Sequence, residues 1–393
     1  MAIAKNIINF IGDRTFYLFT AFVLSICLSI GLSKAMATDM QVTEYNWNLP
    51  EWTPKPVVPE DNPMTAEKVE LGRHLFYEPR LSITGQYSCA TCHQQSLAFT
   101  DGKKVAIGST DEAHARNSMS LANVAYSPVL TWANPLMTNL ESQALIPIFG
   151  EHPIEMGMVG KEQQMIQWMQ DDPKYRQMFA EAFPSKQPVN ISNLTKALAS
   201  FQRSLVSFNS PYDRYRYQGE TNTISAAGKR GEKLFNSERL ECFHCHSGIN
   251  FSDSIHENLA FTETAFHNTG LYNTDGEGSY PPENTGIKEI TQEAEDMGRF
   301  KAPTLRNIAL TAPYMHDGSV ATLRDAIAHY QAGGRTISEG EYAGVGSANP
   351  YKSGFIKGFE ITESEIEDLI AFLQSLTDEE FIGNPAYSDP HGR

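Results

Sequence analysis

The pattern of apolar positions along the chain predicts helices. Apolar side chains recur at helical spacing over 69–76, 194–205 and 366–376. The last stretch has a capping box at its start, because Thr362 is followed three residues later by Glu365. No alternation of apolar and polar residues is long enough to build a sheet. We therefore expect a mainly α-helical fold.

Two stretches lack this periodicity. Prolines are frequent over 38–64, which we interpret as an extended arm packed on the surface. Gly, Asn, Asp and Pro dominate 247–282, which predicts a long loop.

The first 37 residues have the pattern of a signal peptide. Lys5 and Arg14 precede an apolar run over 17–32, and an Ala-Met-Ala sequence ends at Ala37. We predict cleavage after Ala37. An uncleaved membrane anchor is the alternative, but the apolar run has 16 residues, fewer than the about 20 needed to cross a bilayer. The pattern predicts export, with no stable membrane anchor after cleavage.

Two segments recur along the chain. Leu-Gly-Arg-His-Leu-Phe at 71–76 is similar to Arg-Gly-Glu-Lys-Leu-Phe at 230–235. Ser-Leu-Ala-Asn-Val-Ala at 120–125 is similar to Thr-Leu-Arg-Asn-Ile-Ala at 304–309. Similarity at corresponding positions of two halves indicates an internal duplication.

Each half contains one Cys-x-x-Cys-His motif, and together the motifs use every cysteine outside the signal segment. The residues are Cys89, Cys92 and His93 in the first motif, and Cys242, Cys245 and His246 in the second. Cysteines at this spacing each add to a haem vinyl group, and the following histidine reaches the iron. A zinc site or a redox dithiol is the alternative for a single motif. Two motifs with no spare thiol favour two covalently bound c-type haems.

These observations divide the chain into five parts. The predicted parts are a signal peptide at 1–37, an extended Pro-rich arm at 38–64, an N-terminal haem domain at 65–208, a C-terminal haem domain at 209–380 and a tail at 381–393. Covalent haem attachment takes place outside the bacterial cytoplasm, so the motifs and the signal segment both indicate the periplasm or the cell surface.

The chain is acidic. Its net charge is -16, and the first 37 residues carry a net +2, so the mature chain has a charge of -18. This charge argues against nucleic acid as a partner. It suits a basic redox partner, although a solvated acidic surface is the commoner explanation.

The chain resembles the bacterial di-haem cytochrome c peroxidase and MauG superfamily over about Ala66 to Asp378. The most specific stretches are Asp-Met-Gly-Arg-Phe-Lys-Ala-Pro-Thr-Leu-Arg-Asn at 296–307 and Ala-Pro-Tyr-Met-His-Asp-Gly-Ser at 312–319. The resemblance implies two tandem cytochrome c-like domains. It also implies that peroxide reacts at the N-terminal haem, while the C-terminal haem stores or relays electrons.

The resemblance also implies an acid/base residue above the N-terminal haem, as O–O bond cleavage requires. Gln143, Pro147 and Glu155 match the family's distal Gln, Pro and catalytic Glu. The spacing from Gln to Glu is two residues longer than in relatives, which leaves Glu151 as the competing carboxylate, and either residue is alternatively a surface Glu in a loop.

Two positions resemble the MauG-like members of the superfamily. Ser109 stands where classical members have a removable histidine ligand, although His114 is nearby, so we expect a permanently open N-terminal haem. Tyr330 matches an axial tyrosine at the position where classical members have methionine. A phenolate stabilises ferric and higher oxidation states. Alternatively, Tyr330 is a core residue and Met315 or His329 is the ligand.

Further residues are assigned by the same resemblance. Trp132 matches a tryptophan between the two haems, which would carry an oxidising equivalent from one to the other, and a buried core tryptophan is the alternative. A family calcium site between the domains matches Asn117, Thr311 and Pro313. Haem propionates would pair with Arg299 and Arg306.

The leading hypothesis is a periplasmic or surface di-haem oxidoreductase of the MauG-like kind. It would use hydrogen peroxide to oxidise residues, such as tryptophan, of a partner protein, like the members associated with copper-binding peptide or protein systems. One alternative is a conventional cytochrome c peroxidase that reduces peroxide with electrons from a small cytochrome or cupredoxin. Another is a non-enzymatic di-haem electron carrier.

Overall fold

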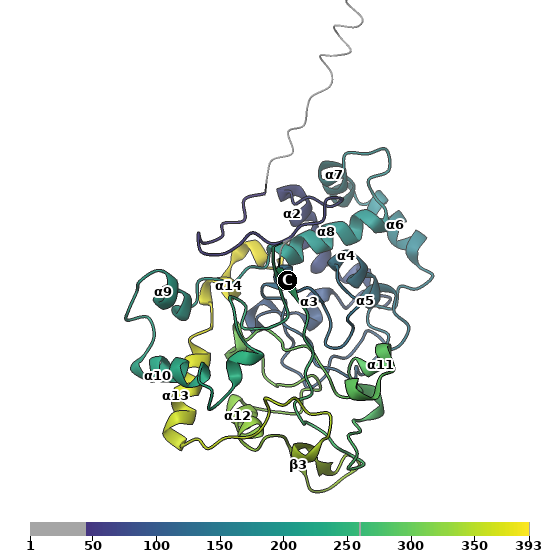
Figure 1. Cartoon of the computed structure of the whole chain (residues 1–393). Helices are drawn as coiled ribbons and strands as arrows, with labels where there is room; N and C mark the ends of the chain where they lie inside the picture. Colours follow the sequence, from purple (N-terminus) through teal and green to yellow (C-terminus); the bar gives the residue numbers. More distant parts are fainter. Residues whose placement is uncertain (1–44, 259–260, 393) are drawn as a thin grey trace, which may run out of the picture. The chain divides into compact units, whose positions relative to one another are not determined.

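The computed structural model describes residues 45–258 and 261–392, and it confirms that the fold is mainly helical (Figure 1). The predicted signal peptide lies outside these residues. The helices of the first half are α2 (Ala66–Phe76), α3 (Cys89–Cys92), α4 (Leu140–Gln143), α5 (Leu145–Phe149), α6 (Glu162–Asp171), α7 (Pro173–Ala182) and α8 (Ile191–Ser204). Those of the second half are α9 (Pro211–Tyr217), α10 (Ala226–Phe235), α11 (Lys288–Thr291), α12 (Leu323–Gln331), α13 (Glu363–Gln374) and α14 (Glu379–Gly383).

Short 3-10 turns join these helices. They are η1 (Pro79–Leu81), η2 (Gln95–Leu97), η3 (Val124–Tyr126), η4 (Cys242–His244), η5 (Pro282–Asn284), η6 (Ala294–Asp296), η7 (Ile308–Leu310), η8 (Gly346–Ala348) and η9 (Pro385–Tyr387).

The same helix pairing occurs in both halves. In the first, α2 packs on α8 so closely that a Cβ at Gly72 would lie 1.9 Å from the carbonyl oxygen of Ala197. In the second, α10 packs on α13, and a Cβ at Gly231 would lie 2.0 Å from the carbonyl oxygen of Asp368. Each glycine therefore allows a helix to approach its partner's backbone. The predicted capping box of α13 is present, since Thr362 Oγ1 accepts a hydrogen bond from the backbone N–H of Glu365 at 3.3 Å.

The described residues contain two small sheets, both antiparallel. One pairs β1 (Ile255–Asn258) with β2 (Phe261–Glu263), and the other pairs β3 (Thr336–Ile337) with β4 (Gly344–Val345). The expectation of an uninterrupted loop over 247–282 was therefore wrong. Strands of two to four residues are too short to show an alternating pattern in the sequence.

Segments from both ends of the described chain pack against its middle. Trp52 of the proline-rich arm stacks on Tyr217, with ring centroids 3.9 Å apart. Near the other end, Tyr387 donates a hydrogen bond to the carbonyl of Ser204 at 2.9 Å, and Gln95 donates one to the carbonyl of Asn384 at 2.8 Å. The last helix, α14, consequently lies beside the first half of the chain (Figure 1).

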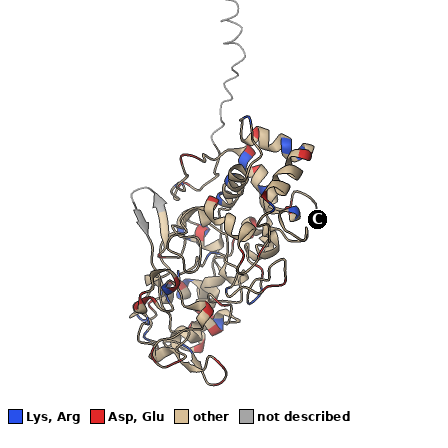
Figure 2. Cartoon of the chain, turned by 90° about the vertical axis from the view of Figure 1, so that its right-hand side faces the viewer, with Lys and Arg blue, Asp and Glu red and all other residues tan. Residues whose placement is uncertain are grey.

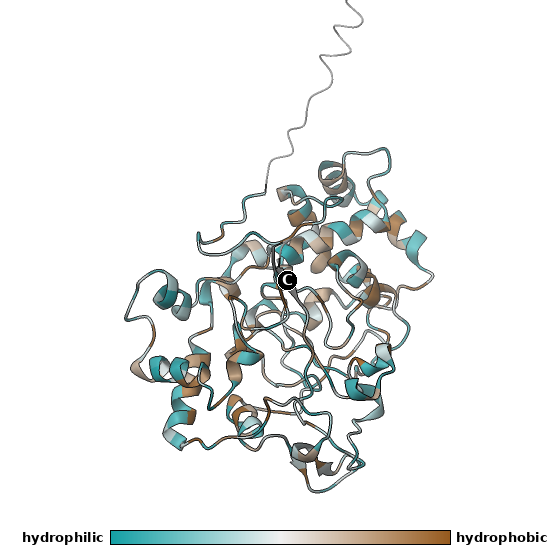
Figure 3. Cartoon of the chain, viewed as in Figure 1, coloured by the Kyte–Doolittle hydropathy of each residue, from teal (hydrophilic) through white to brown (hydrophobic). Residues whose placement is uncertain are grey.

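Charge and hydropathy follow the helix faces. Acidic and basic residues both occur along the helices (Figure 2), and the helices contain both apolar and polar residues (Figure 3). Within residues 45–258 and 261–392, no helix has the length and apolar character that a bilayer crossing requires.

Candidate active site

The first Cys-x-x-Cys-His motif forms the single-turn helix α3 and the residue that follows it. The backbone N–H of Ser88 donates to Thr91 Oγ1 at 3.0 Å, which closes the start of this turn. Cys89 and Cys92 have free thiols, and both line one cavity together with His93. Three groups that can bind a haem therefore face the same space.

The second motif has the same arrangement around η4. Cys242 and Cys245 have free thiols and line a second cavity with His246. Each motif histidine is oriented in the same way. His93 Nδ1 lies 2.8 Å from the carbonyl oxygen of Phe99, and His246 Nδ1 lies 3.1 Å from that of Phe251.

These histidine contacts fit a haem. A carbonyl accepts only from a protonated Nδ1, which leaves Nε2 as the nitrogen available to a metal. Burial lowers the pKa of both His93 and His246 and so favours the neutral, metal-binding imidazole. The residues present in each cavity therefore suit a covalently bound haem with an axial histidine.

The first cavity encloses about 370 Å³ and brings together the predicted peroxide-site residues. Gln143, Pro147 and Glu155 all line it, although Gln143 ends α4 and Glu155 lies beyond α5. The backbone N–H of Met156 donates to the carbonyl of Pro147 at 2.9 Å, which turns the Glu155 segment back toward α5. Glu151, the competing carboxylate, is exposed and does not line the cavity.

The protein around Glu155 changes its acidity. Burial raises the pKa of the Glu155 carboxyl from 4.5 to about 7. The Glu155 side chain is 34% exposed, and it lines the cavity. Glu155 is thus poised to release and take up protons near neutral pH, which suits a general acid/base.

His114 is an additional member of this group that the sequence indicated only as a displaced haem ligand. It lines the first cavity, and its Nε2 lies 3.9 Å from Glu155 Oε1. Ser109, at the position of the family's removable histidine, does not line this cavity. Its side chain is buried, and its backbone N–H donates to the carbonyl of Glu155 at 2.7 Å.

Trp132 lies where the two cavities approach each other, because it lines both of them. The indole Nε1–H donates to the carbonyl of Asn117 at 2.9 Å, and the Trp132 carbonyl accepts from the backbone N–H of Lys301 at 2.8 Å. The residue is 9% exposed. The first half of the chain therefore holds the indole through Asn117, and the second half holds the Trp132 backbone through Lys301.

The second cavity encloses about 220 Å³ and contains two of the three predicted candidates for the sixth ligand. Tyr330 of α12 and Met315 both line it, and burial raises the pKa of Tyr330 above its usual range. His329 does not line it, and its Nε2 is 3.0 Å from the carbonyl oxygen of Thr269. The structure therefore separates His329 from the other two candidates.

The predicted calcium-site residues lie close to this second cavity. Asn117, Thr311 and Pro313 all line it. The backbone N–H of Asn117 donates to the carbonyl of His316 at 2.8 Å, and its side-chain amide donates to the carbonyl of Lys103 at 2.8 Å.

The two arginines predicted to bind propionates have protein partners instead. Arg306 is 1% exposed and lines neither cavity. Its guanidinium forms a forked ion pair with Asp213, at 2.8 and 3.1 Å. Arg299 pairs with Asp296 at 3.0 Å and also lies outside both cavity linings. A buried carboxylate from α9 therefore pairs with the Arg306 guanidinium, and propionate binding by either arginine stays a prediction.

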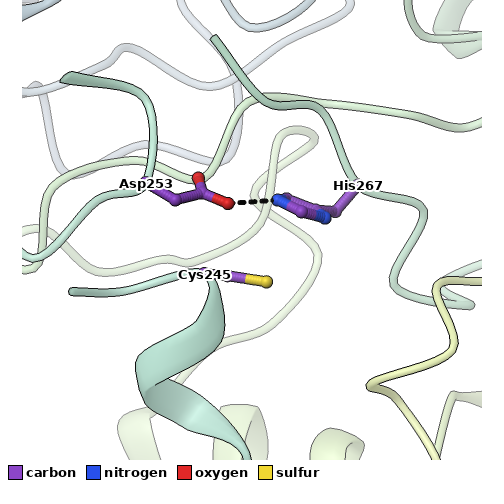
Figure 4. Close-up of side chains that lie close together, drawn as sticks. All are labelled: Cys245, Asp253 and His267. Atoms are coloured by element: carbon purple, nitrogen blue, oxygen red, sulfur yellow. Dashed lines mark hydrogen bonds and ion pairs between the residues drawn. The ribbon is translucent and has the colours of Figure 1, made fainter. Parts of the chain in front are cut away.

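Sequence reasoning missed a polar cluster beside the second motif, shown in Figure 4. His267 Nε2 lies 2.5 Å from Asp253 Oδ2, and Cys245 is close to both. Burial opposes protonation of His267, but hydrogen bonds and charges from Asp253 and Cys245 together outweigh it and raise the pKa of His267 to about 10. Since Cys245 belongs to the haem-attachment motif, this cluster belongs to the haem site. No short-range motif could have identified it.

Two further residues of the second cavity also lacked a sequence signal. Lys301 is buried, which lowers its pKa to about 8, and its ammonium donates to the carbonyl of Val129 at 2.7 Å. His316 stacks on Phe300 with ring centroids 3.6 Å apart. Burial lowers the pKa of His316 to about 3, so its imidazole is neutral.

Comparisons with known proteins agree with this arrangement. A family model described as di-haem cytochrome c peroxidase matches residues 66–222. The chain is 34% identical over 361 residues to the methylamine utilization protein MauG of Methylorubrum extorquens, covering 91% of each chain. It is 29% identical over 316 residues to the cytochrome c551 peroxidase of Pseudomonas aeruginosa, covering 80% of each.

One solved structure is also similar over nearly its whole length. It is the crystal structure of a MauG-like protein associated with microbial copper homeostasis, with 48% identity and a TM-score of 0.86. The match covers 88% of this chain and 99% of the other.

Proposed function

This chain belongs to the di-haem cytochrome c peroxidase family that includes MauG, and from that premise we propose that it activates hydrogen peroxide in order to oxidise a partner protein. The family implies two haem c groups and an oxidoreductase activity. Family membership therefore sets aside the electron-carrier alternative. The steps below assign roles to individual side chains as our proposal.

Cys89, Cys92 and His93 would hold the N-terminal haem, whose iron would supply the peroxide-binding and redox chemistry. Glu155 moves the protons. Its carboxylate accepts a proton from the inner peroxide oxygen and donates it to the outer one, which leaves as water. Gln143 and Pro147 line the same cavity and limit the space that water can occupy beside Glu155.

The observation that carries this proposal is the position of Glu155. It is a cavity-lining carboxyl whose pKa is raised to about 7, and it shares that cavity with the first haem-binding motif. The test is Glu155→Gln in the holoenzyme, with Glu151→Gln as the matched control, since Glu151 is exposed. We expect Glu155→Gln to slow the reaction with peroxide by about 10²–10⁴-fold and Glu151→Gln to leave it unchanged. The reverse result would assign the proton transfer to Glu151.

We propose that Tyr330 is the sixth ligand of the C-terminal haem, which Cys242, Cys245 and His246 hold. Tyr330 lines the second cavity, as Met315 does, and a tyrosinate favours oxidised iron more than a thioether. Burial raises the pKa of Tyr330, and coordination to iron would oppose this effect by stabilising the phenolate. An unchanged low-spin ferric spectrum in Tyr330→Phe, with a changed spectrum in Met315→Leu, would assign the ligand to Met315.

Trp132 connects the two sites in this proposal. Trp132 lines both cavities, and hydrogen bonds from both halves of the chain hold it in place. Its ring would therefore be an intermediate site for electron transfer between the two haems. A surface residue of the partner protein, such as a tryptophan, would be the final electron source. The similarity to the MauG-like protein associated with microbial copper homeostasis, which is 48% identical, supports a partner that is involved in copper homeostasis.

A conventional cytochrome c peroxidase is the second candidate, and Met315 in the second cavity favours it. The two candidates differ in their products. With peroxide and a reduced small cytochrome, a conventional peroxidase oxidises the cytochrome in many turnovers. The enzyme that we propose instead adds a defined mass to its partner protein and oxidises the cytochrome slowly.

Three further features of the sequence remain part of the proposal. We infer that the chain is exported to the periplasm or cell surface, because covalent haem attachment occurs outside the cytoplasm. We infer that 65–208 and 209–380 are haem domains related by duplication. This is supported by the close glycine contacts of α2 with α8 and of α10 with α13, and by the shared histidine orientation. Calcium bound near Asn117, Thr311 and Pro313 would link these domains.

A further inference from the structure

We propose that His114 is a positioning residue for Glu155, and that the two side chains share one proton so that Glu155 keeps a population of carboxylate below neutral pH. This inference rests on the proposed role of Glu155 in peroxide activation. It assigns a task to a histidine that does not need to bind iron.

The positions of the two side chains support a direct interaction. His114 Nε2 lies 3.9 Å from Glu155 Oε1, and both residues line the first cavity. This nitrogen is buried and has no hydrogen-bond partner among the residues that the structure describes. A small rotation of either side chain brings the two atoms within hydrogen-bonding distance, so Glu155 is the natural partner of the unpaired nitrogen.

The backbone holds the two residues at this separation. His114 ends a loop that begins at Ala106, and its backbone N–H donates to the Ala106 carbonyl at 2.9 Å. Within the loop, the backbone N–H of Gly108 donates to the carbonyl of Glu112 at 2.8 Å. The loop is therefore closed by its own hydrogen bonds.

The closed loop is also fastened to the Glu155 segment. The N–H of Ser109 donates to the Glu155 carbonyl at 2.7 Å, and the N–H of Ile154 donates to a carboxylate oxygen of Glu112 at 3.0 Å. A Cβ at Gly108 would lie 1.8 Å from the Ile154 carbonyl oxygen, so the two backbones are in direct contact. His114 and Glu155 consequently belong to one small rigid unit.

Burial is the largest influence on His114 and lowers its pKa, and nearby negative charges oppose this only in part. The negative charges of Asp101 and Glu112 act on the imidazole in addition to that of Glu155. Arg116 also lines the cavity and is the opposing positive charge, but its guanidinium pairs with Glu289. The imidazole therefore lies near the acidic groups of Asp101, Glu112 and Glu155 and near one arginine that is paired with Glu289.

The exchange that we propose is a simple proton transfer. The Glu155 carboxylic acid gives its proton to His114 Nε2, which forms a carboxylate and an imidazolium and requires no other reactant. The carboxylate then serves as the base for peroxide, and the imidazolium stabilises it by charge.

The test compares His114→Phe and His114→Gln with the unchanged holoenzyme. Glutamine keeps a hydrogen-bonding group but cannot take a proton, while phenylalanine only fills space. We measure the rate constant for the reaction with peroxide between pH 5 and 9, and we titrate the protonated Glu155 carboxyl by infrared spectroscopy, identifying its band by its loss in Glu155→Gln. His391→Gln is the control, because it removes an imidazole that hydrogen-bonds the His74 carbonyl and lines neither cavity.

We expect both His114 variants to match the unchanged enzyme at alkaline pH and to lose about tenfold in rate per pH unit below the Glu155 midpoint, where the unchanged enzyme loses less. The carboxyl band should persist to higher pH in both variants. Equal losses at every pH would show a purely structural role, and a changed ferric haem spectrum would make His114 an iron ligand. Either result overturns this inference and leaves the Glu155→Gln test unaffected.

Discussion

The buried ion pair between Arg306 and Asp213 allows a quantitative test of how the second half of the chain is held together. Both side chains are almost fully buried, with 1% and 0% exposure. Besides its forked contact with Asp213, Arg306 donates from Nε to the carbonyl of Ile249 at 2.8 Å, and its guanidinium lies 4.6 Å from the ring centroid of Phe208. The arginine therefore joins α9, the loop after the second haem motif and the segment that follows α8.

Replacing Arg306 by Met keeps most of the side-chain volume but leaves the Asp213 carboxylate buried without its cation. Removing one member of such a pair typically destabilises a protein by about 3–5 kcal/mol. Ser210 still donates to Asp213 through its N–H at 3.0 Å and its Oγ–H at 2.8 Å, so we expect a value near the lower end, about 3 kcal/mol.

The assay is urea unfolding of the holoprotein followed by far-UV circular dichroism. Arg324→Met is the control, because Arg324 pairs with Glu363 and Glu367, and all three side chains are exposed, by 43%, 82% and 64%. We expect a large fall of the midpoint in Arg306→Met and a small one in Arg324→Met. If Arg306→Met left the midpoint unchanged but altered the potential of the C-terminal haem, the arginine would be a propionate partner and our interpretation of the ion pair would be wrong.

The site and the helix contacts lead to four other predictions. Peroxide reactivity should rise with pH through about 7, because the base form of Glu155 is its carboxylate; a flat rate profile from pH 5 to 9 would contradict this. The pKa of Glu155 is higher in the folded protein than the value of about 4.3 in unfolded chains, so the folded state binds this proton more tightly. The unfolding free energy should therefore decline as pH rises from about 4 to 7, and Glu155→Gln should reduce this decline. Gly231→Ala should destabilise the protein by about 1–3 kcal/mol, because the new Cβ would lie 2.0 Å from a backbone carbonyl of α13. Gly354→Ala, at an exposed site with open space around it, should cost less in the same urea assay. Trp132→Phe should leave the first reaction with peroxide intact and slow the oxidation of the C-terminal haem in stopped-flow spectra, and equal rates would remove the indole from the path.

Local patterns in the sequence predicted the parts that depend on neighbouring residues. The helical stretches at 69–76, 194–205 and 366–376 fall within or end just after α2, α8 and α13, because their apolar spacing matches the helical repeat. The two Cys-x-x-Cys-His motifs predicted the haem sites for the same reason, since thioether attachment and axial ligation use residues within one turn. Resemblance to a family added Glu155, Trp132 and Tyr330. Glu155 lines the cavity of the first motif, Tyr330 lines that of the second, and Trp132 lines both.

Only the tertiary structure decided which distant side chains meet. It places His114 beside Glu155 and pairs Arg306 with Asp213, residues separated by 41 and 93 positions in the chain. It also excludes His329 from the second cavity, although His329 is next to Tyr330 in the sequence. Adjacent residues of a helix point in directions about 100° apart, and long-range pairs depend on how whole elements pack. The sequence by itself therefore determined the haem chemistry, whereas the proton-transfer and charge partners depend on contacts that only folding creates.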